Sequence, residues 1–230
     1  KIMITPIQPR GDLVDEVYQR LKDAILFGDL EEGAALVQSD LVEQLDVSRQ
    51  PISHALTKLH QEGLVVERGR RGLMVSLVDA DRLLALYQVR AALDGLAARL
   101  AATRMSDRVI SASDMMPLEQ VMDRGWKAVR KDATRELIGA DVAFHQGVYD
   151  LSGNPAIGEM ASTAWPHFQR SMGLVLTVRE NRELSWKEHR AILEAIGNGD
   201  VELAEKRARD HAERAGRATS ERLRLRHDAA

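Results

Sequence analysis

The sequence predicts a mostly α-helical protein of two domains, a winged helix-turn-helix domain at residues 1–78 and an all-helical bundle at residues 79–230. Two observations support this prediction. In residues 39–62, apolar side chains recur at helical spacing in two short segments, and residues 64–77 then alternate or run apolar as strands do. After Val78 the strand pattern disappears and only helical spacing remains.

The N-terminal segment predicts an arm, a supporting helix and a linker ahead of the helix-turn-helix. Two prolines break regular structure in residues 1–10, and an amphipathic helix is expected from Leu13 to about Gly28. Residues 29–38 are expected to form a connecting loop.

Local signals define the two helices of the predicted helix-turn-helix. Ser39 is expected to cap the first helix, and Ser48 is expected to cap the second. Asp46 lies in the turn between them, where aspartate tolerates the left-handed backbone conformation better than most residues. Gly63 ends the second helix. One face of that helix is apolar and is expected to be buried: Ile52, Ala55, Leu56 and Leu59.

The opposite face of the second helix is polar. It carries side chains that can meet base edges or phosphates: Arg49, Gln50, Ser53, His54 and Thr57. The turn between the predicted strands is basic and rich in glycine: Arg68, Gly69, Arg70, Arg71 and Gly72. We therefore predict a DNA-binding surface made by this helix and the basic wing. The alternative is a helical hairpin and a β-hairpin with solvated arginines, but the caps, the turn and the apolar spacing favour the first interpretation.

The segment from Val47 to Leu59, VSRQPISHALTKL, resembles the recognition segment of the GntR family of bacterial transcription regulators. Residues 28–33 resemble the G-D-L-x-x-G linker of that family, and the resemblance covers residues 11–77. It implies a winged helix-turn-helix that binds DNA. Ser53 and His54 stand where the family usually has an Arg-Glu pair, so the operator sequences of relatives do not carry over to this chain.

The composition is that of an ordinary globular protein whose charges are unevenly placed. The 230 residues carry a net charge of −3, with 44% hydrophobic residues and no cysteine. Acidic residues prevail in residues 11–47 and basic residues in residues 48–75, so the predicted DNA-binding surface is locally positive. Because no apolar run reaches membrane-spanning length and no signal segment is evident, we expect a cytoplasmic protein without a membrane partner.

Helical spacing predicts about six helices after residue 78, packed as a bundle. They are expected at residues 79–100, 113–130, 133–151, 155–179, 185–197 and 200–226. Turn-forming residues at 152–155 and 197–200 separate some of them. The sequence Ser185-Trp186-Lys187-Glu188 has the capping-box pattern and is expected to open the penultimate helix.

A candidate metal site draws residues from different bundle helices: Asp141, His145, His189 and His211. Asp141 and His145 are four residues apart and share a helix face. If residues 197–200 join two antiparallel helices, His189 and His211 lie at similar depth on facing sides. One carboxylate and three imidazoles suit Zn²⁺, Ni²⁺, Mn²⁺ or Fe²⁺. From the residues alone, a surface Asp–His pair and a solvated His189 remain open alternatives.

Residues 144–145, 151–155 and 188–193 resemble motifs of the FCD effector domain of FadR-like members of the GntR family. The resemblance implies that the helical domain binds an effector. It also implies that all four residues of the candidate site bind a divalent metal, with Zn²⁺ or Ni²⁺ favoured.

Arg90 lies among apolar residues and alanines of the first bundle helix. The resemblance implies that this arginine grips a carboxylate of the effector beside the metal. The alternative is a surface ion pair with Asp94, four residues later, where the family more often has glutamate. Of the remaining histidines, His60 and His227 are expected to be solvated, and His167 is expected to line a cavity or the core.

Together these features predict a DNA-binding transcriptional regulator, most simply a repressor, whose operator affinity depends on a small organic acid bound next to the metal. A homodimer on a pseudo-palindromic double-stranded operator is expected, with residues 81–100 as a candidate interface, because one winged helix reads only a short half-site. One alternative is a metal-sensing repressor in which the ion is the signal. Another is a metal-dependent enzyme joined to a DNA-binding domain, but no general base or nucleophile is evident beside the predicted ligands, so we expect no enzyme.

Overall fold

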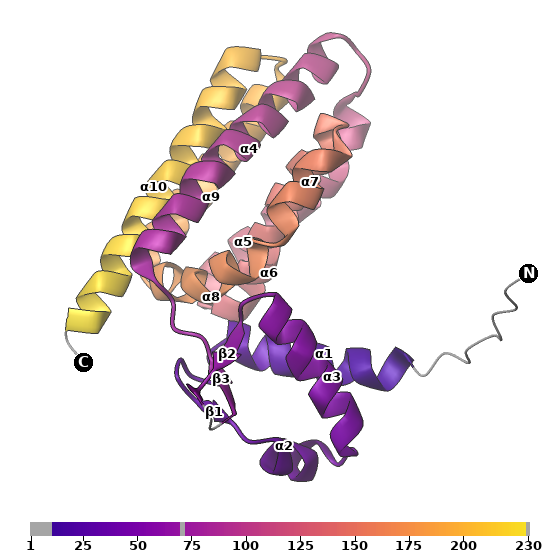
Figure 1. The fold of residues 1–230 in the computed structure, drawn as a ribbon. Helices are drawn as coiled ribbons and strands as arrows, with labels where there is room; N and C mark the ends of the chain where they lie inside the picture. The colour runs from indigo at the N-terminus through magenta and orange to yellow at the C-terminus, as the bar shows by residue number, and fades with distance from the viewer. Residues whose placement is uncertain (1–10, 70–71, 229–230) are drawn as a thin grey trace, which may run out of the picture. The chain divides into compact units, whose positions relative to one another are not determined.

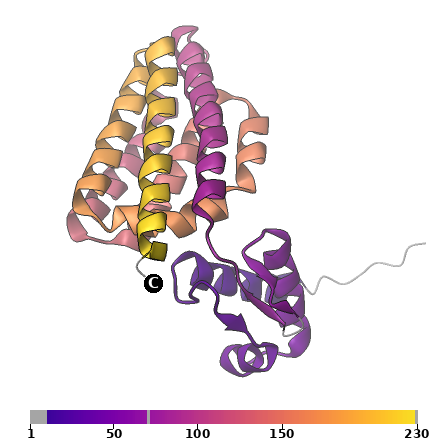
Figure 2. The same ribbon diagram turned by 60° about the vertical axis from the view of Figure 1, so that its left-hand side comes forward.

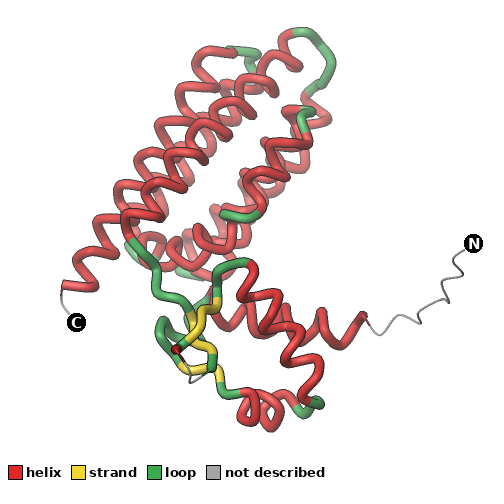
Figure 3. The backbone as a smooth tube through the Cα atoms, in the orientation of Figure 1, coloured by secondary structure: helices red, strands yellow, loops and turns green. Residues whose placement is uncertain are grey.

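The computed structural model describes residues 11–69 and 72–228, which contain ten helices and three short strands. The chain divides into two compact units between Leu77 and Val78. Within the described residues, the strands are confined to the N-terminal unit, and the second unit is entirely helices and turns (Figure 3). The predicted fold class, a winged helix-turn-helix followed by a helical bundle, is confirmed.

The N-terminal unit packs three helices beside a small antiparallel sheet. Its elements are α1 (Gly11–Leu26), β1 (Ala35–Leu36), α2 (Gln38–Leu45), α3 (Arg49–Gln61), β2 (Val65–Glu67) and β3 (Leu73–Val75). Apolar residues of α1, among them Val17 and Leu21, share one core with the buried face of α3. Ile52, Ala55, Leu56 and Leu59 are at most 1% exposed, so the predicted buried face of the second helix is confirmed.

Strand β1 is an element that the sequence did not predict. The strand order is β1-β3-β2, and Ala35 of β1 pairs with Met74 of β3. Ala35 lies within residues 29–38, which were expected to form a loop. Two residues are too few for an alternating pattern to be visible. The strand forms because β3 has a second edge, where Val75 donates its backbone N–H to the carbonyl of Ala34 at 3.0 Å.

The turn of the helix-turn-helix is as predicted, but one cap is wrong. Asp46 has a φ of 50°, in the left-handed region, directly after α2. Helix α2 begins two residues earlier than expected, with Val37 at the N-cap, and Ser39 lies inside the helix with its hydroxyl 3.1 Å from a carboxylate oxygen of Asp40. Ser48 does hold the N-cap position of α3, although its side chain makes no capping hydrogen bond.

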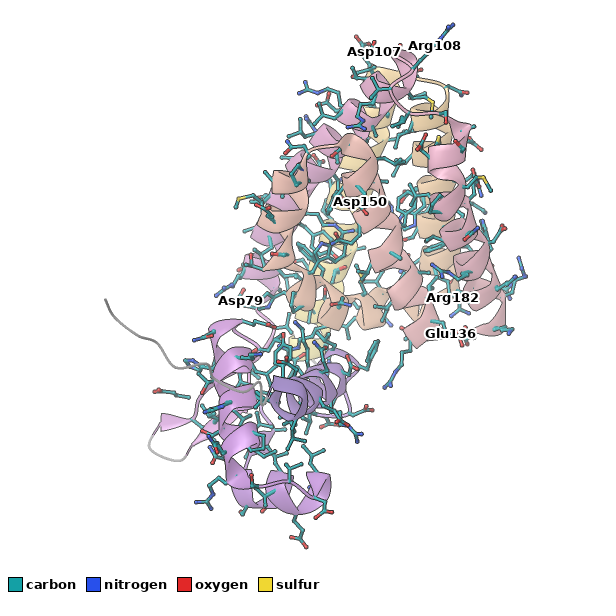
Figure 4. The ribbon with its side chains drawn as sticks, turned by 90° about the vertical axis from the view of Figure 1, so that its right-hand side faces the viewer. Asp79, Asp107, Arg108, Glu136, Asp150 and Arg182 are labelled. Atoms are coloured by element: carbon teal, nitrogen blue, oxygen red, sulfur yellow. The ribbon has the colours of Figure 1, made fainter. Side chains whose placement is uncertain are left out.

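The second unit is a bundle of long and short helices. Its elements are α4 (Ala80–Ser106), α5 (Ala112–Lys131), α6 (Thr134–Ser152), α7 (Pro155–Ser162), α8 (Trp165–Leu176), α9 (Arg179–Gly197) and α10 (Val201–Asp228). Helices α4 and α10 run side by side in both views (Figures 1 and 2). Asp79 caps α4 at one end of the bundle, and Asp107 and Arg108 follow α4 at the other end (Figure 4).

Three predicted helix boundaries in the bundle are wrong, and one is the end of α4, which continues to Ser106 instead of ending at residue 100. The helix expected over residues 155–179 is divided into α7 and α8, because Pro166 falls in the first turn of a new helix, where its missing N–H costs nothing. Helix α9 begins at Arg179, so Ser185 is an internal residue and not a cap. The buried Ser185 hydroxyl instead accepts a hydrogen bond from Arg214 at 3.1 Å, a tertiary contact that the local pattern cannot reveal.

Close packing of α5 on α9 depends on Gly125. A Cβ atom at this position would lie 1.6 Å from Cζ2 of Trp186, so only glycine leaves room for the indole. The indole N–H donates to the carbonyl of Met122 at 2.9 Å, and its ring lies edge-on to the imidazole of His189 at a centroid distance of 4.8 Å. This packing therefore positions a candidate metal ligand from outside the site.

None of the helices within residues 11–69 and 72–228 combines the length and the apolar composition that a membrane-spanning segment requires.

Candidate DNA-binding face and metal centre

Helix α3 presents the predicted DNA-contacting residues on its outer side. Arg49, Gln50, His54 and Thr57 are exposed, and Ser53 is half-buried. The hydroxyl of Thr57 donates to the carbonyl of Ser53 at 2.9 Å, so this hydroxyl is engaged within the helix. Because the apolar side of α3 is buried against α1, the polar side of α3 faces outward from the N-terminal unit, as DNA contact requires.

The described part of the wing is exposed and held by a backbone hydrogen bond. The N–H of Arg68 donates to the carbonyl of Gly72 at 2.8 Å, and both residues are exposed. Gly72 has a φ of 102°, a conformation that favours glycine. The predicted contacts Arg70 and Arg71 lie outside the described residues. The wing can thus carry at least the Arg68 guanidinium to a phosphate.

The four predicted metal ligands come together inside the bundle. Asp141 and His145 lie on α6, His189 on α9 and His211 on α10, and each is at most 5% exposed. One ring nitrogen from each histidine lies within 4.8 Å of the others. Nε2 of His189 is 3.1 Å from Nε2 of His211 and 3.5 Å from Oδ1 of Asp141. Nε2 of His145 is 3.8 Å from Oδ2 of Asp141.

The chemistry of these atoms fits a divalent metal. Among the described residues, Oδ2 of Asp141 and Nε2 of His145 are buried without a hydrogen-bond partner, which is costly unless another group satisfies them. Burial lowers the pKa of His145 and lowers that of His189 well below its ordinary value, so both rings are neutral and each offers a lone pair. Nitrogen ligands about 2.1 Å from one ion lie roughly 3.0–3.4 Å apart, close to the separation of His189 and His211.

Asp94 orients one of these imidazoles. Its Oδ2 is 3.2 Å from Nδ1 of His145, so a proton on Nδ1 leaves Nε2 directed at the other ligands. The hydroxyl of Tyr149 donates to Oδ1 of Asp94 at 2.5 Å. Burial alone would raise the pKa of Asp94, but His145 and Arg90 beside it hold that pKa well below its ordinary value, so Asp94 is ionised. Burial and Asp94 raise the pKa of Tyr149, which keeps its phenol protonated.

Arg90 is a buried residue beside the metal ligands, so the surface-pair interpretation is wrong. Its side chain and that of Asp94 are each 3% exposed, with Nε 3.3 Å from Oδ2. Its Nη2 is 4.0 Å from Oδ2 of Asp141. The guanidinium carbon lies 4.6–5.4 Å from the ring centres of Trp165, Phe168 and Tyr87, a cationic contact with three aromatic faces.

A small cavity of about 20 Å³ adjoins this arrangement. Its polar lining includes Arg90, Asp141, His211 and Arg214, and Met172 is among its apolar residues. This volume is enough for about one water molecule. An organic acid therefore needs the lining side chains to move before it enters.

Several residues of the site were missed from the sequence. The sequence pattern predicts Asp94 only as a partner of Arg90 and predicts no role for Tyr149, although its position four residues after His145 places both on one face of α6. Glu188 lies next to a ligand in the sequence and contacts another, His211, at 2.7 Å. Elsewhere, His60 is exposed as predicted and His167 is half-buried. The side chain of His227 lies outside the described part of the chain.

Comparison with known proteins identifies the two units. Residues 13–75 match the family described as bacterial regulatory proteins, gntR family, and residues 85–214 match the FCD domain. The chain belongs to the GntR family and carries an FCD domain. This GntR-family protein is a transcriptional regulator and not an enzyme, which confirms both the predicted resemblance and the expectation that the chain has no catalytic function.

Two curated relatives of this GntR-family regulator cover most of its length. An uncharacterized HTH-type transcriptional regulator in an unstable DNA locus of Streptomyces ambofaciens is 33% identical over 202 residues, which is 85% of this chain and 80% of the relative. The HTH-type transcriptional repressor RspR of Escherichia coli K12 is 23% identical over 214 residues, 90% of this chain and 89% of the repressor.

Two solved structures share the fold of the GntR-family regulator. A putative GntR transcriptional regulator from Rhodococcus sp. RHA1 superposes with a TM-score of 0.76 at 21% identity, covering 90% of this chain and 96% of that one. E. coli McbR/YncC superposes with a TM-score of 0.74 at 19% identity, covering 98% of this chain and all of the other, 100%.

Proposed function

We propose that this regulator is a cytoplasmic repressor whose affinity for its operator is set by a small carboxylate effector bound beside a divalent metal. The observation that supports this most directly is the position of Arg90. Its guanidinium lies 4.0 Å from Oδ2 of Asp141 and lines the same cavity as His211. A carboxylate in that cavity would meet the arginine with one oxygen and a metal on the histidines with the other. Repression is proposed because RspR, which is similar to this protein over 90% of the chain, is a repressor.

The proposed metal is Zn²⁺ or Ni²⁺, with Mn²⁺ and Fe²⁺ as further candidates. Three imidazoles and one carboxylate are ligands that all four ions accept, and the chain has no cysteine to favour a softer ion. The metal would supply a positive charge for the effector carboxylate. His145, His189, His211 and Asp141 would hold the ion, with Asp94 orienting His145.

A metal-sensing repressor is the second candidate function, and the small cavity favours it. A space of about 20 Å³ admits no organic acid without rearrangement, whereas an ion needs only the ligand atoms already present. The two functions are separated by titrating operator DNA with metal-free and metal-loaded protein, with and without small carboxylic acids and their neutral amides. An effect of the acids but not the amides supports the effector, and an effect of metal alone supports metal sensing.

A row of apolar side chains on α4 supports a homodimer. The row consists of Leu86, Val89, Leu93, Leu96 and Leu100. Their spacing of three and four residues is that of a coiled-coil seam, yet each is half-buried or exposed, and Val89 is 60% exposed. A second copy would cover this row and bring two recognition helices to the half-sites of one pseudo-palindromic operator.

Val89→Glu is expected to weaken the homodimer strongly. A glutamate in the seam would be buried without a partner, so the dissociation constant should rise at least about 100-fold. Sedimentation velocity over a concentration series measures this constant. Val109→Glu is the control, because Val109 is 64% exposed and lies outside α4. A wild-type protein that is monomeric at micromolar concentration would contradict the proposed homodimer. Equal dissociation constants for the two variants would show that α4 is not the dimer interface.

Arg49→Ala is expected to weaken binding of a duplex that the wild-type protein selects from a random-sequence pool. Loss of a phosphate contact should reduce the magnitude of the slope of log affinity against log salt by about one. Loss of a base contact should instead reduce the free-energy difference between the selected duplex and one with the wrong base by about 1–3 kcal/mol. Fluorescence anisotropy at several salt concentrations distinguishes the two. The control is Arg20→Ala on α1, whose arginine pairs with Glu16 at 2.8 Å. If Arg49→Ala leaves both the affinity and the salt slope unchanged, this face of α3 is not the DNA-binding surface.

A further inference from the structure

A carboxylate outside the proposed ligand set lies directly behind His211. Oε2 of Glu188 is 2.7 Å from Nδ1 of His211, while Nε2 of the same ring is 3.1 Å from Nε2 of His189. The two nitrogens of His211 therefore face different groups, one a carboxylate and the other the remaining ligands. A carboxylate accepts hydrogen bonds only, so the proton belongs on Nδ1 and the lone pair on Nε2.

We infer that Glu188 is a positioning residue for the metal centre: it fixes the tautomer and ring orientation of His211, and Arg214 in turn holds Glu188 in place. The inference rests on the proposed metal site. It assigns a role to a residue that is neither a proposed metal ligand nor part of the cavity lining. In metal sites, hydrogen-bonded groups behind the ligands commonly set ligand orientation and basicity.

Arg214 leaves Glu188 little freedom. Its Nε donates to Oε1 of Glu188 at 2.6 Å and its Nη2 to Oε2 at 2.5 Å, a bidentate pair of fixed geometry. The same Nη2 donates to the hydroxyl of Ser185 at 3.1 Å. Arg214 lies on α10, three residues after His211, and Glu188 lies on α9. The network therefore joins the two helices that carry His189 and His211.

The same arrangement recurs on the other side of the site. Nδ1 of His145 contacts Asp94, which in turn contacts Arg90. In the same way, Nδ1 of His211 contacts Glu188, which in turn contacts Arg214. Two imidazoles from different helices thus each carry a carboxylate backed by an arginine. This recurrence indicates that Glu188 serves the imidazole, because an ion pair that only linked α9 to α10 would not need a histidine between the carboxylate and the ligands.

The test compares Glu188→Ala and Glu188→Gln with Glu194→Gln, which changes an exposed carboxylate on the same helix. Zn²⁺ affinity is measured by competition with a chromogenic chelator, and thermal unfolding is measured on the metal-free proteins. We expect Glu188→Ala to bind Zn²⁺ about 10–100-fold more weakly than wild type, with a smaller loss in Glu188→Gln, whose amide oxygen still accepts from Nδ1. Glu194→Gln should match wild type.

Wild-type Zn²⁺ affinity in both Glu188 variants would overturn the inference and leave Glu188 as a link between helices. If Glu188→Ala does not fold without metal, Glu188→Gln decides. An affinity loss with unchanged metal-free unfolding supports positioning, and unchanged affinity with a lower unfolding temperature rejects it. If the wild-type protein itself binds no divalent metal, the proposed metal site is wrong. Failure of the Glu188 inference looks different, because the wild-type protein and both Glu188 variants then bind Zn²⁺ equally well.

Discussion

His189→Ala is expected to abolish tight metal binding by the bundle. The ring is fully buried, and its Nε2 lies within 3.5 Å of both His211 and Asp141. Removing a ligand should cost more affinity than the roughly 10–100-fold typical of losing a group behind a ligand. Metal at a thousand times its dissociation constant stabilises a folded protein by about 4 kcal/mol. The wild-type unfolding temperature should therefore rise on adding Zn²⁺, and that of His189→Ala should not.

Native mass spectrometry and calorimetric titration with Zn²⁺ measure the loss directly. His60→Ala is the control, because it removes an exposed histidine from the N-terminal unit. The winged helix-turn-helix should keep its fold in His189→Ala, since it forms a separate compact unit with its own core. Stoichiometric Zn²⁺ binding by His189→Ala at wild-type affinity would contradict the proposed ligand set.

Arg90→Ala is expected to destabilise the bundle by about 3–5 kcal/mol, the usual cost of removing one partner of a buried ion pair. Arg90 and Asp94 are each 3% exposed, so the carboxylate would be left buried beside Asp141 without its cation. The matched control is Arg99→Ala on the same helix, whose side chain is 48% exposed and 3.8 Å from Glu205. This control should change the free energy of unfolding by less than about 0.5 kcal/mol. Urea unfolding followed by circular dichroism measures both.

Arg90→Lys separates the structural role of this residue from effector binding. Lysine keeps the positive charge near Asp94 but lacks the planar fork that grips a carboxylate through two parallel hydrogen bonds. We expect Arg90→Lys to fold and to bind Zn²⁺, yet to lose the effect of carboxylic acids on DNA affinity. By linkage, an acid that weakens DNA binding must itself bind more weakly when DNA is present. A wild-type response in Arg90→Lys would exclude Arg90 as the carboxylate clamp.

The sequence alone determined the features that depend on neighbouring residues. The turn at Asp46 and the buried face from Ile52 to Leu59 follow from backbone preference and helical spacing, which act within a few residues. The sequence also predicts the four proposed ligands, because two of them are one helical turn apart and the other two flank a turn cluster. The family resemblance added what spacing could not, namely that all four belong to one site.

Only the tertiary structure decided where each side chain is buried and which groups share a hydrogen bond. Arg90 and Asp94 have the spacing of an ordinary surface pair, and they form a buried pair because aromatic rings from α8 cover the guanidinium. Strand β1 exists because β3 offers it an edge. Glu188 lies beside His189 in the sequence but contacts His211, 23 residues away. Local patterns carry no information about such contacts, because the free energy that selects them arises from packing between helices that are distant in the chain.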